Sequence, residues 1–360
     1  MNYLIVKKKN VHITRNKKME TWRLLKDNIT EPFMHFAVEE AVLRNVDEDN
    51  SPNTIRIRML EPSTSIGIYQ HPEEDIDVEY CKKNGIKIVR RINPGGAVYQ
   101  DKGTFCYSAY FKKSFLKKLS VNSTTELYQI FGQAVILTCS DYGISAKISP
   151  VNDIAVNGKK IYGSAQLDWY SAFMHSGSFL INVNKEKMQR TLKPSNLKFI
   201  DKGFKNVKDR VLNLSELVNE KIDIDEFQNK FVKHLSHVLK INTKIEGLNK
   251  KELELAQDLY KTKFSNPQWT YSEKRNYSTI LSTKVKSGVL ILSLNLNYGV
   301  IKDISIKGDF LIASGEQIKS IENNLKNVNI SKAFNIIDNS LLPEDIKKGI
   351  ITLLKDIKKD

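Results

Sequence analysis

A glycine-containing stretch at residues 90–103 constrains this chain more than any other segment. It opens with two arginines, Arg90 and Arg91, and continues into an Asn-Pro-Gly-Gly loop at 93–96. Apolar, strand-like runs flank the loop, and glycines let backbone N–H groups approach a bound group closely. The stretch therefore predicts a loop that can bind an anion, although a plain Pro-Gly turn explains this segment equally well when it is taken alone.

A second stretch, residues 152–166, places a carboxylate and a lysine around a tight Asn-Gly turn at 157–158. The carboxylate is Asp153 and the lysine is Lys160. An enzyme that activates a carboxylate through a phosphate-bearing intermediate needs close backbone N–H groups, fixed positive charge and a metal ligand. Asp153 alone could be a turn residue and Lys160 a surface lysine on an edge strand, so the combination of both stretches is what favours a functional site.

Length and composition indicate an ordinary globular protein. The chain has 360 residues, enough for a sizeable core and two domains, with 41% hydrophobic and 27% charged residues. No apolar run reaches the roughly 18 residues of a membrane span. Three cysteines, Cys81, Cys106 and Cys139, share no Cys-x-x-Cys spacing. This count favours a reducing, cytoplasmic location over a disulfide framework or a zinc site.

The formal net charge of +15 requires an explanation. The lysines are scattered, without an Arg-rich stripe or interleaved stacking aromatics, so we expect no nucleic-acid partner. An anionic nucleotide substrate or an acidic protein partner fits the charge, because a positive surface steers anions. A general lysine bias of the source is the simpler explanation. Residues 1–18 are interpreted as a loose basic leader, with Met1 or Met19 as the true start.

Hydrophobic patterns predict strands and helices without a regular β-α-β alternation, hence an α+β fold. Helices are expected where Val38, Ala41, Val42 and Val46 recur, and after Ser123, whose Ser-x-x-Glu pattern is typical of a helix start. A further helix carries the apolar residues between 227 and 239. The expected strands are 55–59, 64–69, 86–90, 105–111, 153–156, 160–165 and 178–183.

The C-terminal third is expected to form a second, small α+β domain. The Lys-rich segment 240–251 is interpreted as a linker, and a short helix with Leu253, Ala256 and Leu259 follows it. Alternating residues within 292–306, interrupted by Tyr298-Gly299, predict a hairpin. Helices near 317–325 and 343–357 complete the domain. The expected divisions are a leader at 1–18, a catalytic domain at 19–245 and an accessory domain at 246–360.

In this order the two stretches resemble the lipoate–protein ligase A family. Its pattern is an Arg-Arg pair, a Gly-rich loop, then Asn-Asp and Lys-x-x-Gly-Ser-Ala, here at 160–165. Further matches are the Glu39-Glu40 helix, His175-x-Gly177, the segment 210–214 and the segment 259–271, which resembles the opening of an accessory domain. The resemblance covers nearly everything after about residue 20. It implies a biotin/lipoate ligase-like catalytic domain with a mixed sheet, plus a small C-terminal accessory domain.

The resemblance also implies an activity. The family activates lipoate with ATP and Mg²⁺ to lipoyl-adenylate, releasing AMP when the lipoyl group passes to one lysine of an acceptor. The implied acceptors are lipoyl domains of 2-oxoacid dehydrogenase E2 subunits or the H protein of glycine cleavage, with no nucleic acid and no membrane. The preference between lipoate and octanoate stays open, as do the acceptor and the oligomeric state.

By the same resemblance, Lys160 and Asp153 are the catalytic residues and Asp153 is the magnesium ligand. Lys160 would contact the carbonyl and phosphate oxygens of the adenylate. The glycine loop and its arginine would hold lipoate and phosphates, and Tyr99 would lie beside the adenine. The implied substrate and ATP contacts are Arg91, Gly95, Gly96, Ala97, Val98, Tyr99, Asn152, Gly163, Ser164, Ala165 and His175.

Three positions depart from the family pattern. Pro94 stands where the first of three glycines is usual, which stiffens the loop and removes one N–H donor. Gln100 replaces a usual histidine and Thr104 a usual asparagine. The loop could therefore hold the acyl chain differently, or favour another chain.

Two other functions remain open. Related octanoyl or lipoyl transferases on this scaffold carry the acyl group on a cysteine in the segment before the Asn-Asp pair. Here that segment, 145–151, has no cysteine, and we interpret Cys106 and Cys139 as packed core thiols. A non-catalytic lipoyl-binding homologue is the other alternative, and the presence of both Lys160 and Asp153 argues against it.

Overall fold

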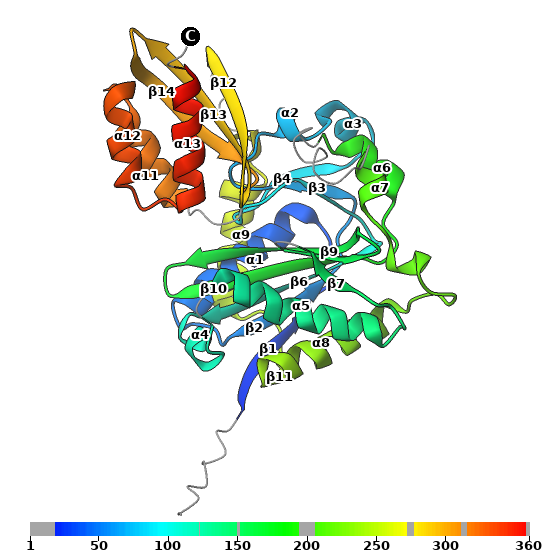
Figure 1. The fold of residues 1–360 in the computed structure, drawn as a ribbon. Helices are drawn as coiled ribbons and strands as arrows, with labels where there is room; N and C mark the ends of the chain where they lie inside the picture. Colours follow the sequence, from blue (N-terminus) through cyan, green and yellow to red (C-terminus); the bar gives the residue numbers. More distant parts are fainter. Residues whose placement is uncertain are drawn as a thin grey trace, which may run out of the picture.

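The computed structural model describes residues 19–121, 123–149, 152–193, 206–271, 277–310 and 315–357. The predicted basic leader at 1–18 lies outside these residues. Figure 1 shows a larger body built on a broad sheet and a smaller C-terminal body beside it. This is the predicted α+β architecture of two parts.

The larger body is organised by an eight-stranded mixed sheet with the order β11-β1-β2-β6-β10-β9-β8-β7. Strand β1 runs parallel to its two neighbours, and the pairs from β2 to β7 are antiparallel. A second sheet of the order β4-β3-β5 lies above it. The strand bounds are β1 Glu20–Lys26, β2 Thr54–Arg58, β3 Ser63–Ile66, β4 Lys87–Arg90, β5 Val98–Gln100, β6 Thr104–Lys112, β7 Lys147–Ser149, β8 Asp153–Val156, β9 Lys159–Trp169, β10 Ala172–Leu180 and β11 Ile241–Ile245.

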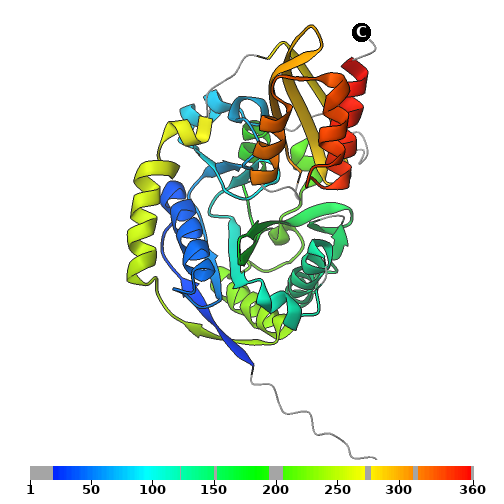
Figure 2. The ribbon, with the colours of Figure 1, turned by 90° about the vertical axis from the view of Figure 1, so that its left-hand side faces the viewer.

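Two pairs of helices cover the large sheet on opposite faces (Figures 1 and 2). Helices α5 (Thr124–Ser140) and α8 (Ile224–Leu239) pack on one face, where buried aromatic side chains such as Phe131 and Phe227 fill the core. Helices α1 (Pro32–Asp47) and α9 (Lys250–Leu259) lie side by side on the other face. Ser123 caps α5 by accepting the N–H of Glu126, which confirms the predicted helix start. The shorter helices are α2 Pro72–Asp75, α3 Val78–Lys83, α4 Ser114–Lys118, α6 Lys185–Thr191, α7 Val207–Arg210, η2 Leu214–Glu216, η3 Tyr260–Phe264 and α10 Pro267–Tyr271.

The smaller body is an antiparallel sheet of the order β12-β13-β14-β15 with helices on one side. The predicted hairpin forms, because Tyr298 and Gly299 both adopt the positive φ that a tight two-residue turn requires. One helix of this body, α12, was not among the expected elements. The bounds are β12 Thr279–Val285, β13 Gly288–Asn297, β14 Val300–Gly308, β15 Val328–Asn329, α11 Gly315–Leu325, α12 Ile330–Asp338 and α13 Glu344–Ile357.

The predicted linker at 240–251 is wrong. Strand β11 within it adds to the edge of the large sheet beside β1, and α9 packs on α1. Glu252 on α9 is fully buried and accepts two hydrogen bonds from the Arg23 guanidinium on β1. The domain start at 246 stays a prediction, and the packing of α9 favours a later division.

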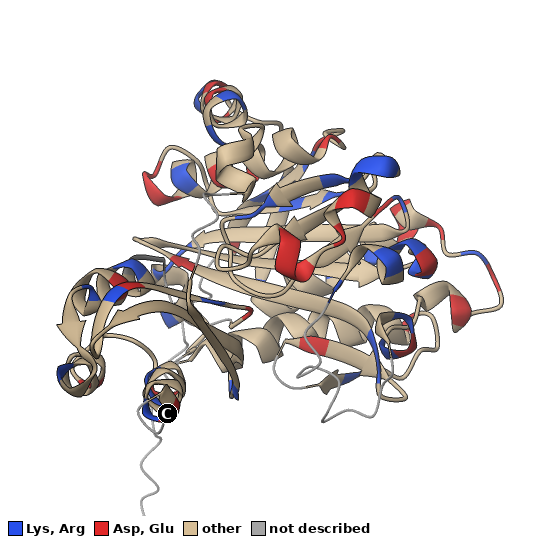
Figure 3. Cartoon of the chain, turned by 90° about the horizontal axis from the view of Figure 1, so that it is seen from above, with Lys and Arg blue, Asp and Glu red and all other residues tan. Residues whose placement is uncertain are grey.

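Four of the seven predicted strands, 55–59, 86–90, 105–111 and 153–156, form within one residue of their expected bounds. Three differ more: the strand expected at 64–69 ends at Ile66, that at 160–165 continues to Trp169, and that at 178–183 starts at Ala172 and ends at Leu180. Among the described residues, the helices are too short or too polar to traverse a bilayer. In Figure 3, Lys and Arg segments adjoin Asp and Glu segments over several elements of both bodies.

The small body docks on the large one through the loop after β3. Tyr69 stacks on Phe310 with ring centroids 4.8 Å apart, and its carbonyl accepts the N–H of Gly308 at 3.1 Å. Arg90 at the end of β4 secures this loop by donating to the carbonyls of Ile68 and Gln70, at 2.9 and 2.6 Å. Its guanidinium also donates to the carbonyls of Trp269 and Thr270 on α10. Arg90 thus ties the docking loop to the end of the segment that leads into the small body.

Candidate functional site

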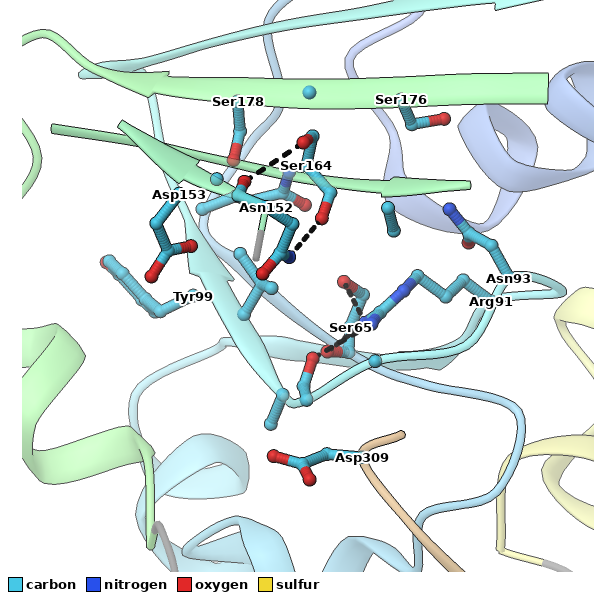
Figure 4. Close-up of a pocket in the computed structure, with 18 of the residues that line it drawn as sticks. Ser65, Arg91, Asn93, Tyr99, Asn152, Asp153, Ser164, Ser176, Ser178 and Asp309 are labelled. Atoms are coloured by element: carbon cyan, nitrogen blue, oxygen red, sulfur yellow. Dashed lines mark hydrogen bonds between the residues drawn. The ribbon is translucent and has the colours of Figure 1, made fainter. Parts of the chain in front are cut away.

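A cleft of about 570 Å³ opens between the large sheet, the glycine loop and one edge of the small body. All of the predicted site residues except His175 line it. They reach it from β8, β9, β5 and the loop between β4 and β5 (Figure 4). Sequence segments that lie some 60 residues apart therefore meet at one place, as the resemblance implied.

The floor of the cleft is one row of residues across five neighbouring strands. Asp153 on β8 is paired with Gly163 on β9, Gly163 with Ser178 on β10, Ser178 with Cys106 on β6, and Cys106 with Arg58 on β2. All five line the cleft. Since alternate residues of a strand face opposite sides, this row faces away from the aromatic core under α5 and α8. The small side chains in its middle leave room above the sheet.

One end of the row carries a network of charges. The Lys160 ammonium lies 2.7 Å from one Asp153 oxygen, and the Arg210 guanidinium lies 3.4 Å from the other. A Cβ on Gly163 would collide with the Lys160 Nζ, so the ammonium lies directly over this glycine. The Lys160 side chain is 30% exposed, whereas Asp153 is nearly buried. The carboxylate therefore fixes a lysine that solvent and ligands can still reach.

The glycine loop is shaped from inside by Arg91. This buried guanidinium donates to the carbonyls of Ser65, Pro94 and Gly96 at 2.9–3.1 Å. Burial lowers the pKa of Arg91 to about 10, which still leaves it charged at neutral pH. Gly95 has a φ of 102°, a conformation that side chains disfavour, so the residue type is required here.

Asn152 and Ser164 hold the strand ends beside Asp153 together. The Asn152 amide donates to the Ser164 carbonyl, and the Ser164 hydroxyl donates to the Asn152 carbonyl at 3.0 Å (Figure 4). In the same view Tyr99 and Asp153 are drawn next to each other, and both line the cleft. Burial raises the pKa of Tyr99, so its hydroxyl stays protonated at neutral pH.

The opposite end of the row is closed by a buried ion pair. Glu39 on α1 accepts from Arg58 at 2.9 Å and from the hydroxyls of Ser108 and Ser176 at 2.6 and 3.2 Å. The Arg58 Nε lies 3.1 Å from the His35 Nε2. Both members of the ion pair are at most 4% exposed. No role was predicted for this end of the row, although a Glu on a helix and alternating arginines on a strand were the available signals.

His175 lies elsewhere. It is fully buried on the core side of β10, with its ring stacked on Phe131 at 3.9 Å. Its two nitrogens meet the Tyr162 hydroxyl and the Gln166 amide at 3.3 and 3.2 Å. Burial lowers its pKa to about 3, so it is a neutral core residue rather than a group facing the cleft.

The small body also contributes to the cleft, through residues that the sequence had not singled out. The turn between β12 and β13, residues 284–289, and Asp309 after β14 line the cleft wall. Figure 4 places the Asp309 carboxylate across the opening from Ser65. No local sequence signal marks this turn, because its position depends on how the two bodies dock.

Among the described residues, no group of three or more His, Cys, Asp or Glu side chains is arranged to hold a metal ion. Mg²⁺ commonly uses one or two carboxylates and completes its shell with water and substrate phosphates. Asp153 can supply one such carboxylate at the cleft wall. The cleft residues therefore fit a magnesium ion that arrives with a nucleotide.

Comparison with known proteins identifies the family. The family model described as the lipoyl protein ligase A/B catalytic domain matches residues 31–236, more than half of the chain. The chain belongs to the lipoyl protein ligase A/B family. A second model, the bacterial lipoate protein ligase C-terminus, matches residues 274–353 and coincides with the small body. This confirms the predicted resemblance and the two-part architecture.

Curated relatives of this ligase-family chain include both ligases and transferases. Lipoate-protein ligase LplJ of Bacillus subtilis is 29% identical over 79% of this chain and 83% of its own length. Octanoyltransferase LipM of Brevibacillus brevis is 26% identical over 70% of this chain and 99% of its own length. The family assignment alone therefore does not select one reaction.

Solved structures agree with the fold. A bipartite lipoate protein ligase of Thermoplasma acidophilum, described with its E2 lipoyl domain, has a TM-score of 0.61 at 28% identity and covers 72% of this chain and all of its own. Lipoate-protein ligase A bound with ATP has a TM-score of 0.60 at 26% identity over 70% of this chain and 98% of its own. P. falciparum LipL1, at 20% identity, shares the fold over 95% of this chain and all of its own with a TM-score of 0.72.

Proposed function

We propose that this protein is an ATP-dependent, AMP-forming lipoate–protein ligase that uses Mg²⁺. It activates lipoate to lipoyl-adenylate and transfers the lipoyl group to one lysine of an acceptor domain. The observation that carries the proposal is the Lys160 ammonium, held over Gly163 by Asp153 in a cleft bordered by the glycine loop. The relative solved with ATP supports the nucleotide.

In the first step, a lipoate carboxylate oxygen attacks the α-phosphorus of ATP and pyrophosphate leaves. Negative charge grows on the α-phosphate oxygens during this attack. In the second step, the acceptor amine attacks the acyl carbonyl, and AMP leaves with the electrons of the broken C–O bond. A cation fixed beside both centres stabilises each transition state more than the reactants, and Lys160 is positioned for that role.

The remaining cleft residues orient the reactants. Arg91 fixes the carbonyls of the glycine loop, which leaves the loop backbone close to the cleft. Asp153 is the residue that would hold Mg²⁺, and the ion when bound neutralises phosphate charge. Arg210 keeps the Asp153 carboxylate in place from the side of α7.

The acceptor is proposed to be a lipoyl domain, as in the Thermoplasma system whose ligase is described with its E2 lipoyl domain. The glycine cleavage H protein is a second acceptor of the same chemistry. The acceptor lysine has an ordinary pKa near 10.4, so only a small fraction of it is uncharged at neutral pH. The cleft must bind this free amine. Three buried, unpaired cysteines are consistent with a proposed cytoplasmic location.

Because an octanoyltransferase, LipM, is among the relatives, a cysteine-dependent octanoyltransferase is the alternative function. Cys106 does line the cleft, so it is the thiol to be considered. Burial raises its pKa to about 11, and a thiol in that state is a poor nucleophile at neutral pH. Cys139 is buried in the core beneath α5, where burial raises its pKa to about 12. The geometry therefore favours the ligase.

The deciding experiment is exchange of labelled pyrophosphate into ATP, dependent on added lipoate. We expect exchange with the purified chain, and Cys106→Ser should retain it. The ligase proposal fails if exchange is absent and an acyl group accumulates on Cys106 in a form that hydroxylamine releases.

A further inference from the structure

A second cavity, of about 270 Å³, lies outside the cleft and shares no lining residue with it. It opens between the end of α3, the edge strand β4 and the segment η3–α10, which precedes the small body. None of the residues predicted for the functional site lines it. The cavity is therefore a candidate site of its own, and its lining indicates what it can bind.

The wall of this cavity is largely aromatic. Phe264 is buried, whereas Phe33 and Tyr271 are partly buried, and all three line the cavity. Phe264 packs edge-on against the Trp269 ring, with the ring centroids 6.2 Å apart. Aromatic rings favour edge-to-face and offset contacts with further rings, beyond the gain from burying apolar area. The wall therefore suits a ligand with an aromatic body.

The polar groups of the lining are mostly donors, and two of them are cations. Lys82 on α3 and Lys87 on β4 are exposed and line the cavity, and within the described ranges neither forms an ion pair with a carboxylate. The Asn266 side-chain oxygen accepts the N–H of Gln268 at 3.0 Å, which leaves the Asn266 amide N–H groups as further donors. Among the described residues, no Asp or Glu side chain lines the cavity. This lining complements an anion, and a carboxylate accepts hydrogen bonds from all of these donors.

We propose that this cavity is a second ligand site, separate from the cleft, which binds a small aryl monocarboxylate. The aromatic ring of the ligand packs against Phe33, Phe264 and Tyr271, and its carboxylate faces Lys82 and Lys87. A ligand of this small size binds with a Kd of about a millimolar. The inference goes beyond the proposed function and does not depend on it, because the cavity and the cleft share no residue.

The site borders the contact that ties the small body to the large one. Thr270 lines the cavity, and its carbonyl accepts from the Arg90 guanidinium at 2.8 Å. The Trp269 indole N–H donates to the Arg90 carbonyl, also at 2.8 Å. A ligand ring that packs on Phe264 lies close to this indole and changes its surroundings. The indole N–H of Trp269 therefore reports occupancy of the cavity directly.

The test titrates 3-phenylpropionate into the full chain and follows the indole N–H resonances by NMR. The neutral comparison ligand is 3-phenylpropan-1-ol, and Trp22, buried in the core under α5 and α8, is the internal reference. The double variant Lys82→Met with Lys87→Met removes both charges and keeps the side-chain lengths. Lys83→Met is the matched control, because Lys83 is exposed on the same helix and lies outside the cavity. Lys160→Ala reports whether the acid binds in the cleft instead.

We expect the acid to shift the Trp269 resonance saturably and to leave that of Trp22 in place, and the alcohol to bind about threefold to tenfold more weakly, on the scale of one or two exposed ion pairs. The double variant should bind the acid as weakly as the alcohol, whereas Lys83→Met and Lys160→Ala should bind it like the wild type. The inference is overturned if the Trp269 resonance does not move, or if the alcohol binds as tightly as the acid. It is also overturned if Lys160→Ala abolishes the shift while the double variant keeps it, since the acid would then lie in the cleft.

Discussion

The two ends of the cleft floor carry similar charges in different surroundings. At one end Asp153 pairs with a lysine that is 30% exposed, and at the other Glu39 pairs with Arg58, which is 4% exposed. A cation that solvent can reach is available to a substrate, whereas a sealed pair with further hydroxyl donors is committed to the fold. The comparison teaches that two acid–base pairs on one row of strands differ in access: the Asp153–Lys160 pair is open to a substrate, and the Glu39–Arg58 pair is closed into the fold.

The largest expected effect is on activity, and it comes from the Asp153–Lys160 end of the row, called the reachable end because solvent contacts its lysine. Lys160→Ala should lower lipoate-dependent exchange by about a hundredfold to a thousandfold, the usual loss when one charge-stabilising contact is removed. The free energy of unfolding should change little, because a strand lysine whose side chain is 30% exposed contributes little to it. The matched control is Lys159→Ala on the same strand, whose side chain is exposed and outside the cleft. Activity above about a tenth of wild type would remove Lys160 from its assigned role.

At the other end of the row, a substitution in the buried Glu39–Arg58 pair should lower the free energy of unfolding. Glu39→Gln keeps the shape but leaves Arg58 buried without its carboxylate, which should cost about 3 kcal/mol of unfolding free energy. Urea denaturation measures this directly. Asp153→Asn is the comparison variant, and it should lose activity with a smaller loss of stability. If both variants lose stability equally, the distinction between the two ends is wrong.

A smaller effect, on the docking of the small body, is expected at the contact between Tyr69 and Phe310. Tyr69→Ala removes a buried ring stacked on Phe310, which should weaken docking by about 2 kcal/mol. Faster hydrogen exchange of the Gly308 amide, which donates to the Tyr69 carbonyl, reports the loosened contact. Tyr298→Ala, at a fully exposed turn, is the control. Unchanged exchange at Gly308 would show that Tyr69 does not hold the two bodies together.

The smallest effect concerns two buried histidines, one on each face of the sheet. The pKa of His175 is about 3 and that of His35 is also lowered, both first of all by burial. The unfolded chain takes up protons below pH 6.5 while the folded chain does not, so stability falls as the pH drops from about 6.5 toward 3. Each histidine adds up to about 1.4 kcal/mol per pH unit to the slope of the unfolding free energy against pH. In urea melts between pH 7 and 5, His175→Gln should flatten this slope, and an unchanged slope would mean that His175 is already protonated in the fold.

Local patterns predicted much of the fold, and twelve of the thirteen predicted site residues line the cleft. The Ser123 cap and the Tyr298-Gly299 turn depend on neighbouring residues, and both formed as expected. The cleft residues of the two motifs also came together as the resemblance implied. His175 is the predicted site residue that does not line the cleft. Its motif did not predict that the side chain projects from the core face of β10.

Other features depend on distant partners and could not be predicted. Segment 240–251 is polar enough to suggest a linker, yet β11 pairs with β1, more than 200 residues away. Glu252 is buried because distant groups, the Arg23 guanidinium and the Ser51 hydroxyl, donate to its carboxylate. The part of the cleft wall at 284–289 similarly follows from docking through Tyr69.

The central claim is that the reachable end activates lipoate as an adenylate. The direct measurement counts nucleotide products while the chain lipoylates a purified lipoyl domain in the presence of ATP and Mg²⁺. We expect one AMP and one pyrophosphate for each lipoylated lysine, with both lost in Lys160→Ala. Lipoylation that consumes no ATP, or that yields ADP, would contradict it.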